Sequence, residues 1–148
     1  MKYQLAQTNI AKFRLPQDHP VNADFVNSID RVNQLAESQS GFIWRFTGSE
    51  DLVAEVLGEP NIVFNMSVWS DMDALASFVY RNKAHRGIMR RRNEWFETVE
   101  FHMALWWVEQ GCKPSVEEAK HRLETLEKNG PSLSAFTFKA PFSAPDSD

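Results

Sequence analysis

The chain has 148 residues, of which 43% are hydrophobic and 24% charged, the profile of a single globular domain that can bury a core. Its net charge of -4 makes bulk attraction to nucleic acid or to an anionic membrane unexpected. No apolar run approaches the roughly 20 residues of a membrane span, the N-terminus lacks the apolar stretch of a signal peptide, and one cysteine excludes an internal disulfide. These features favour a cytoplasmic protein whose partners are neither nucleic acid nor membrane.

The first half of the chain alternates between strand and helix patterns. Apolar and polar residues alternate over residues 3–13, which predicts a half-buried strand, and two prolines end it. Residues 22–38 carry apolar side chains at helical spacing. Residues 42–46 predict a short strand, and the polar, glycine-containing stretch 47–60 predicts a long hairpin connection. Residues 61–69 predict a strongly apolar strand.

The second half repeats the alternation. A capping sequence opens a helix over residues 72–80, and a further helical stretch continues to about residue 96. Residues 100–108 predict an apolar strand. Ser115 and Glu118 form a capping box that opens another helix, and Gly130-Pro131 ends it. Residues 135–142 predict a last strand.

This order, β-α-β-β-α-β followed by α-β, predicts an α+β fold. The first six elements are a ferredoxin-like split βαβ arrangement, an antiparallel sheet with helices on one face, and the last two are a C-terminal α-β extension. We expect one domain over residues 1–143 and a flexible tail over 144–148. The strands 61–69 and 100–108 are apolar on both faces, so both faces need a cover. The second cover is expected to be another copy of the chain, which makes the protein a homodimer.

Seven motifs in order resemble the domain-of-unknown-function 3291 family. They are MKYQLAQTN at 1–9, GFIWR at 41–45, SVWS at 67–70, His85 with RRNEWF at 91–96, ALWWV at 104–108, PSVEEA at 114–119 and AFTF at 135–138. That family is similar to the dimeric α/β-barrel superfamily, which includes antibiotic-biosynthesis-type monooxygenases, haem-degrading monooxygenases and polyketide cyclases. The resemblance implies a dimeric α/β barrel. It implies no activity, because a fold does not determine a function.

The candidate catalytic residue is His85, whose near-neutral pKa suits proton transfer. Tyr80, Arg92, Trp95 and Trp106 are candidates for the polar anchors and aromatic walls of a surrounding pocket. The competing interpretations are a histidine hydrogen-bonded to backbone, an arginine on a solvated face, and tryptophans that pack in the core. No two histidines have the spacing of a metal site, so no metal is expected.

Asn9 and Trp69 are candidates for the same cavity as Trp106. In related haem-degrading enzymes an Asn on the first strand, a Trp and a His on the second helical region make the haem site. Asn9 and His85 match two of these positions, whereas Phe78 stands nearest to the family's Trp. The resemblance therefore leaves haem as an alternative ligand, although no cofactor is expected.

Two classes of function follow. The first is a small enzyme, a cofactor-independent monooxygenase or a cyclase, that acts on an aromatic or polyketide-like molecule. It needs a dry pocket, with His85 as base and Tyr80 or Asn9 to orient the substrate. The second is a non-catalytic binding protein for a hydrophobic metabolite or haem. The sequence does not separate the two classes.

Overall fold

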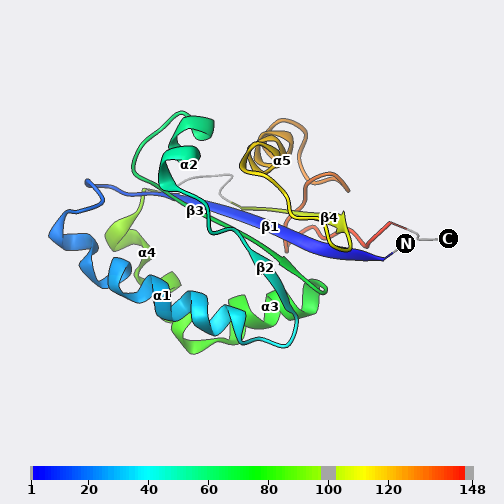
Figure 1. Ribbon diagram of the computed structural model, residues 1–148, viewed down its shortest axis with the longest axis horizontal. Helices are drawn as coiled ribbons and strands as arrows, with labels where there is room; N and C mark the ends of the chain where they lie inside the picture. The colour runs from blue at the N-terminus through cyan, green and yellow to red at the C-terminus, as the bar shows by residue number, and fades with distance from the viewer. Residues whose placement is uncertain (1, 98–102, 146–148) are drawn as a thin grey trace.

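The structure is a computed structural model, and it describes residues 2–97 and 103–145. Four antiparallel strands form one sheet in the order β2-β3-β1-β4 (Figure 1). Their bounds are β1 Tyr3–Lys12, β2 Phe42–Arg45, β3 Ile62–Trp69 and β4 Met103–Glu109. This order and the all-antiparallel pairing confirm the predicted α+β class and its ferredoxin-like strand arrangement.

The helices form two layers, one on each face of the sheet (Figure 1). They are α1 Ala23–Glu37, α2 Glu50–Leu57, α3 Met72–Arg81, α4 Lys83–Trp95 and α5 Val116–Asn129, with a short 3-10 helix η1 Pro20–Asn22 before α1. We call the side that carries α1, α3 and α4 the three-helix face, and the side that carries α2 and α5 the two-helix face. No helix within residues 2–97 and 103–145 has the length and apolar character to cross a membrane.

Helix α2 corrects the prediction of a long connection over 47–60. The Ser49 side chain accepts a hydrogen bond from the Leu52 amide at 3.1 Å, and Glu50 and Asp51 occupy the first turn, where acidic residues favour a helix. Gly58, at φ 76°, ends the helix in the left-handed conformation. These local signals were present in the sequence, but the polar character of the stretch concealed a short amphipathic helix.

The C-terminal segment corrects a second prediction, because 135–142 is not a strand. Among the described residues, its backbone pairing with β4 is limited to Phe136 and Leu105, which exchange two hydrogen bonds of 2.9 Å. Tight turns at 132–135 and 137–140 interrupt the extended backbone. Ala135 packs in the core of the two-helix face, and Phe136 packs in that of the three-helix face. The segment therefore crosses the edge of β4 and joins both cores. The predicted start of β4 at residue 100 lies outside the described residues.

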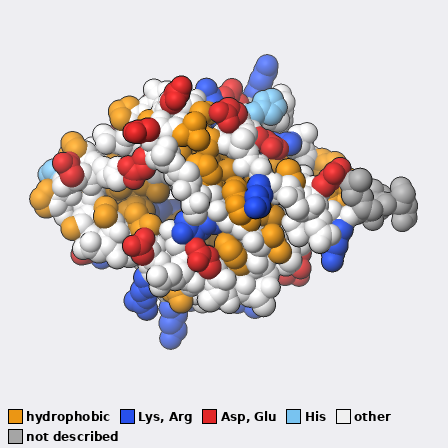
Figure 2. Space-filling view, in the orientation of Figure 1, with side chains coloured by type: hydrophobic (Ala, Val, Ile, Leu, Met, Phe, Trp, Pro, Cys, Tyr) orange, Lys and Arg blue, Asp and Glu red, His pale blue; other side chains and the backbone are white. Residues whose placement is uncertain are grey.

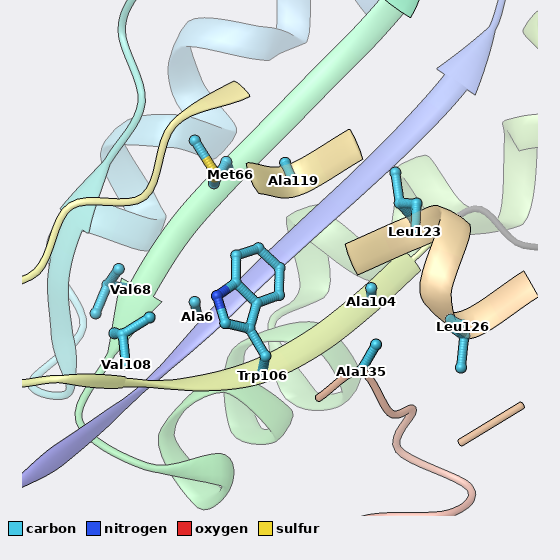
Figure 3. Close-up of a cluster of buried hydrophobic side chains, with 10 residues drawn as sticks. All are labelled: Ala6, Met66, Val68, Ala104, Trp106, Val108, Ala119, Leu123, Leu126 and Ala135. Carbon is cyan, nitrogen blue, oxygen red and sulfur yellow. The ribbon is translucent and has the colours of Figure 1, made fainter. Parts of the chain in front are cut away.

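The two-helix face has an apolar core (Figure 3). It consists of Ala6, Met66, Val68, Ala104, Trp106, Val108, Ala119, Leu123, Leu126 and Ala135. Three of these belong to α5, so the same chain covers the face that was expected to need a second copy. The expectation that this face needs a second copy as its cover was therefore wrong, whereas the homodimer itself stays a prediction. The helix over 116–129 was predicted only as part of a C-terminal extension, without a role in covering the sheet.

Candidate functional site

Four polar side chains form a hydrogen-bonded row on the three-helix face of the two central strands. We call Gln7, Asn9, Asn65 and Ser67 the polar ladder. Gln7 lies opposite Ser67, and Asn9 lies opposite Asn65, in the antiparallel pairing of β1 with β3. The Gln7 amide nitrogen donates to Asn65 Oδ1 at 2.6 Å and to Ser67 Oγ at 2.8 Å, and the Asn9 amide nitrogen donates to Gln7 Oε1 at 3.0 Å. Polar groups at the centre of a sheet are unusual unless they are paired, so this row is the first candidate for a site.

The outer end of the polar ladder is only partly buried and has unused hydrogen-bonding groups. Gln7 and Ser67 are buried, whereas Asn9 and Asn65 are half-buried although they belong to central strands beneath helices. Within residues 2–97 and 103–145, no side chain accepts a hydrogen bond from the Asn65 amide nitrogen or donates one to the Asn9 amide oxygen. One donor and one acceptor are therefore available side by side.

Trp69 closes the inner end of the polar ladder. Its indole Nε1 donates to Ser67 Oγ at 2.8 Å, and its side chain is almost fully buried. Its ring stacks on Phe78 with a centroid separation of 5.6 Å, and Phe78 in turn packs 5.2 Å from the His85 ring. A continuous row of rings thus joins the ladder to the predicted catalytic histidine.

His85 lies near the start of α4, where the Asn82 side chain caps the helix by accepting from the His85 amide at 3.1 Å. Its ring Nδ1 lies 3.1 Å from the Val79 carbonyl oxygen. A carbonyl can only accept, so Nδ1 carries the proton and Nε2 keeps its lone pair in the neutral ring. Burial lowers the pKa of His85 from its ordinary value of 6.5, and the Val79 hydrogen bond partly opposes this shift. At neutral pH the side chain is therefore a neutral base.

Trp95 closes the far end of the three-helix face. It is fully buried and packs 5.4 Å from Phe25, beside Phe13 and Phe96. Its indole Nε1 is buried without a hydrogen-bond partner among the described residues. Such a donor is costly to bury, and a ligand or water that accepted from it would remove the cost.

Arg91 holds α4 against α1 above Trp95. It donates to Glu94 at 2.8 Å and to Asp24 at 2.9 Å, and its guanidinium lies 4.9 Å from the Trp95 ring centroid. The hydrogen bond from Arg91 lowers the pKa of Glu94. Among the described residues, Arg91 is thus the member of the arginine run that pairs with carboxylates, while Arg92, the predicted binding residue, is exposed.

The structure does not bring all the predicted site residues together. Asn9 and Trp69 share the three-helix face with His85 and Trp95. Trp106 pairs with Ala6 and lies in the core of the two-helix face, so it cannot share a cavity with Asn9. The Trp106 ring packs among the ten core side chains of Figure 3 and under the Arg122 guanidinium, 5.6 Å away. Tyr80 is 58% exposed and packs edge-on against Phe138.

The described residues do not fit a haem. A porphyrin needs a wide slot in front of His85, but Phe78 packs against that ring and Trp69 stacks behind Phe78. A groove of about 400 Å³ lies on the opposite face, between α2 and α5. Within residues 2–97 and 103–145, no three His, Cys, Asp or Glu side chains gather as a metal site would require.

The polar ladder was largely missed from the sequence. The only signal was the presence of Asn65 and Ser67 at alternate positions inside an otherwise apolar strand, matched by Gln7 and Asn9 at alternate positions in the first strand. Two polar residues at period two occupy one face of a strand. Whether the polar pair of one strand lies beside the polar pair of the other depends on the register between the strands, which cannot be read from the sequence.

The fold and the site define a small α+β protein with an open antiparallel sheet and a polar row beneath three helices. The chain belongs to the family described as Domain of unknown function (DUF3291), whose model matches residues 4–148. Two solved structures are similar at a TM-score of 0.51. One is a conserved protein from Methanosarcina mazei Go1, with 14% identity over 72% of this chain and 91% of that one. The other is a protein from Shewanella oneidensis, with 12% identity over 74% and 93%. At these identities the likeness concerns the fold alone. No curated protein matches the chain.

Proposed function

We propose that this protein binds a small, uncharged, partly aromatic molecule on the three-helix face, over the outer end of the polar ladder. The observation that carries the proposal is the half-buried Asn9–Asn65 pair, which offers an amide oxygen and an amide nitrogen at the centre of the sheet. A site with a few fixed polar groups among aromatic side chains is typical of small-molecule pockets.

The chemistry of the polar ladder selects the class of ligand. All four side chains are neutral, and no described Lys or Arg side chain donates to them. An anion would therefore lose its hydration without gaining an opposite charge. A hydroxyl or an amide can both donate and accept, as Asn9 and Asn65 require, whereas a ketone can only accept, from the Asn65 amide nitrogen. An aromatic or polyketide-like molecule with such groups satisfies both the polar pair and the surrounding rings.

Two glutamines on the same strand provide a matched test. Gln7 belongs to the polar ladder, whereas Gln4 is buried on the two-helix face. With dihydroxyanthraquinone as probe and the quenching of tryptophan fluorescence as readout, Gln7→Leu should weaken binding about 5- to 150-fold, the effect of one lost polar contact network. Gln4→Leu should leave the affinity within about twofold. Equal weakening of probe binding by both changes would reject the site. So would a parent protein and variants that all fail to bind the probe tightly.

A second candidate function is catalysis with His85 as general base. The observation that favours it is the Nδ1 contact with Val79, which leaves Nε2 unprotonated, together with the lowered pKa. Nε2 would remove a proton from an acidic phenol or enol of the bound molecule. The resulting phenolate or enolate would then attack a carbonyl of the same molecule through its nucleophilic carbon, as in a cyclase, or transfer electrons to dioxygen, as in a cofactor-independent monooxygenase.

His85→Ala separates the two candidates. If His85 is the base, turnover of the quinol form of the probe should fall roughly 10²–10⁴-fold with little change in probe affinity. His85→Asn keeps a group able to donate to Val79 and serves as the control for the backbone contact. A lower melting temperature with unchanged turnover in both variants would remove His85 from the site and leave a binding protein.

A further inference from the structure

The second surface of interest is a groove on the two-helix face, between α2 and α5. Its volume is about 400 Å³, and it lies far from the polar ladder, across the sheet. Leu52 and Val56 supply its apolar side chains, and Leu52 is 39% exposed. Figure 2 shows hydrophobic side chains exposed between these helices with acidic side chains on both sides. An apolar strip with a polar rim is typical of a surface that contacts another macromolecule.

The rim of the groove is acidic. Glu55 of α2 and Glu117 and Glu124 of α5 line it, with Lys120 and His121 as the basic or titratable members. Lys120 lies 4.0 Å from Glu124, so one carboxylate already has a cation beside it. Glu55 and Glu117 form no ion pair with another described residue. The groove therefore favours a partner that presents cations on either side of an apolar side chain.

Helix α4 presents that pattern on its outer side. Lys83, Arg86 and Arg90 recur at intervals of three and four residues, which places them on one face of the helix. Met89 is 36% exposed and lies between the last two. All three cations are exposed, and none of them pairs with a carboxylate of the described residues, in contrast to Arg91.

We propose that α4 of one molecule docks in the α2–α5 groove of a second copy of this chain. Met89 would contact Leu52 and Val56, while Arg86 and Arg90 would face Glu55 and Glu117. These two surfaces of the same protein are complementary both in charge and in the position of their apolar side chains.

The geometry determines the kind of assembly. The groove and α4 lie on opposite faces of the sheet, so two molecules cannot exchange the same contact reciprocally (Figure 1). The contact is heterologous, and it produces a ring or a linear chain rather than a two-fold dimer. One groove and one helix make a small interface, so the association is weak and depends on concentration and salt.

Sedimentation velocity on the full chain, from about 1 µM to about 1 mM, tests this proposal across the range of weak affinities. The parent should associate at low salt and dissociate in about 1 M salt, where charges are screened beyond about 3 Å. The double variant Glu55→Lys with Glu117→Lys should not self-associate, and neither should Arg86→Glu with Arg90→Glu. The two variants mixed should associate again, because one retains a basic helix and the other an acidic groove.

The control is Asp18→Lys with Asp30→Lys, which changes the net charge as the groove variant does, at exposed positions outside the groove. It should leave the dissociation constant within about threefold, whereas each surface variant should raise it more than about tenfold. Circular dichroism confirms that each variant is folded. A parent that is monomeric at the highest concentration overturns the proposal. So does a salt-insensitive dimer, or variants that associate as the parent does.

Discussion

The two faces of this sheet are built from the same strands but carry different kinds of buried side chain. On the two-helix face, alternate residues of β1, β3 and β4 bring Ala6, Met66 and Trp106 against the apolar side of α5. On the three-helix face, the intervening residues bring Gln7, Asn65 and Ser67 beneath α1, α3 and α4. The same strands thus place an apolar core on one face of the sheet and a hydrogen-bonded row on the other.

The difference has an energetic reason. Apolar burial contributes about 25 cal/mol per Å² and supplies most of the stability of a domain. A buried polar row contributes little net stability even when every group is paired, and it becomes costly when one partner is lost. Both faces therefore stabilise the fold through their apolar cores, and the three-helix face in addition carries polar groups that a core alone would not select.

The largest effect is expected on the apolar face, at Trp106. The side chain is fully buried in the cluster of Figure 3, so Trp106→Ala should reduce the free energy of unfolding by about 3–5 kcal/mol. Urea unfolding followed by circular dichroism measures the loss. Trp107→Ala, at a half-buried neighbouring position, is the control and should cost less. If Trp106→Ala weakened probe binding per folded molecule while Trp107→Ala did not, Trp106 would belong to a site after all.

The next effect concerns a single hydroxyl of the polar ladder. Ser67 Oγ accepts from both Gln7 and Trp69, so Ser67→Ala leaves the buried Trp69 Nε1 without its partner. The expected loss is about 1–3 kcal/mol, from one unsatisfied buried donor. Ser67→Thr keeps the hydroxyl and should recover part of this stability. Urea unfolding measures the stability of both variants. Equal stability of Ser67→Ala and the parent would show that the ladder is not a connected network.

The smallest effect is the pH dependence that comes from His85. Its pKa is lowered in the folded protein, so the unfolded chain binds the proton more readily. The stability contribution is complete above the ordinary pKa of 6.5 and is lost as pH falls through the lower pKa of the folded state. Thermal unfolding between about pH 5 and pH 7.5 should therefore show stability rising with pH.

His85→Phe should flatten this dependence, since it removes the titrating group. His121→Gln, which changes an exposed histidine of α5, should leave it unchanged. A parent whose melting temperature falls as pH rises over this window would show that His85 is stabilised in its charged form, and the assignment of Nε2 as a free base would fail.

Much of the local structure could be predicted because its causes are local. A period-two pattern located β1, a strongly apolar run located β3, and the Ser115 capping box located the start of α5, because these signals lie within a few neighbouring residues. Helix α2 could have been found in the same way from Ser49 and Gly58, but its eight residues form only about two turns, too few for a long periodic pattern. The family match over residues 4–148 agrees with the resemblance drawn from the seven motifs.

The candidate site could be predicted only in part. His85, Asn9, Trp69 and Trp95 were identified from residue type, and the structure places them on one face of the sheet. Trp106 was assigned to the same cavity, although one position along a strand reverses the face to which a side chain points.

By itself, the sequence determined the fold class, most of the element order and the residue types available for a site, because periodicity, caps and turn residues act over short distances. Only the tertiary structure decided that Gln7 meets Ser67, that α5 covers the second face, and that the segment around Phe136 crosses the edge of β4. These outcomes depend on strand register and on contacts between residues far apart in the chain. No local pattern encodes them, because their free energy arises only when the distant segments pack together.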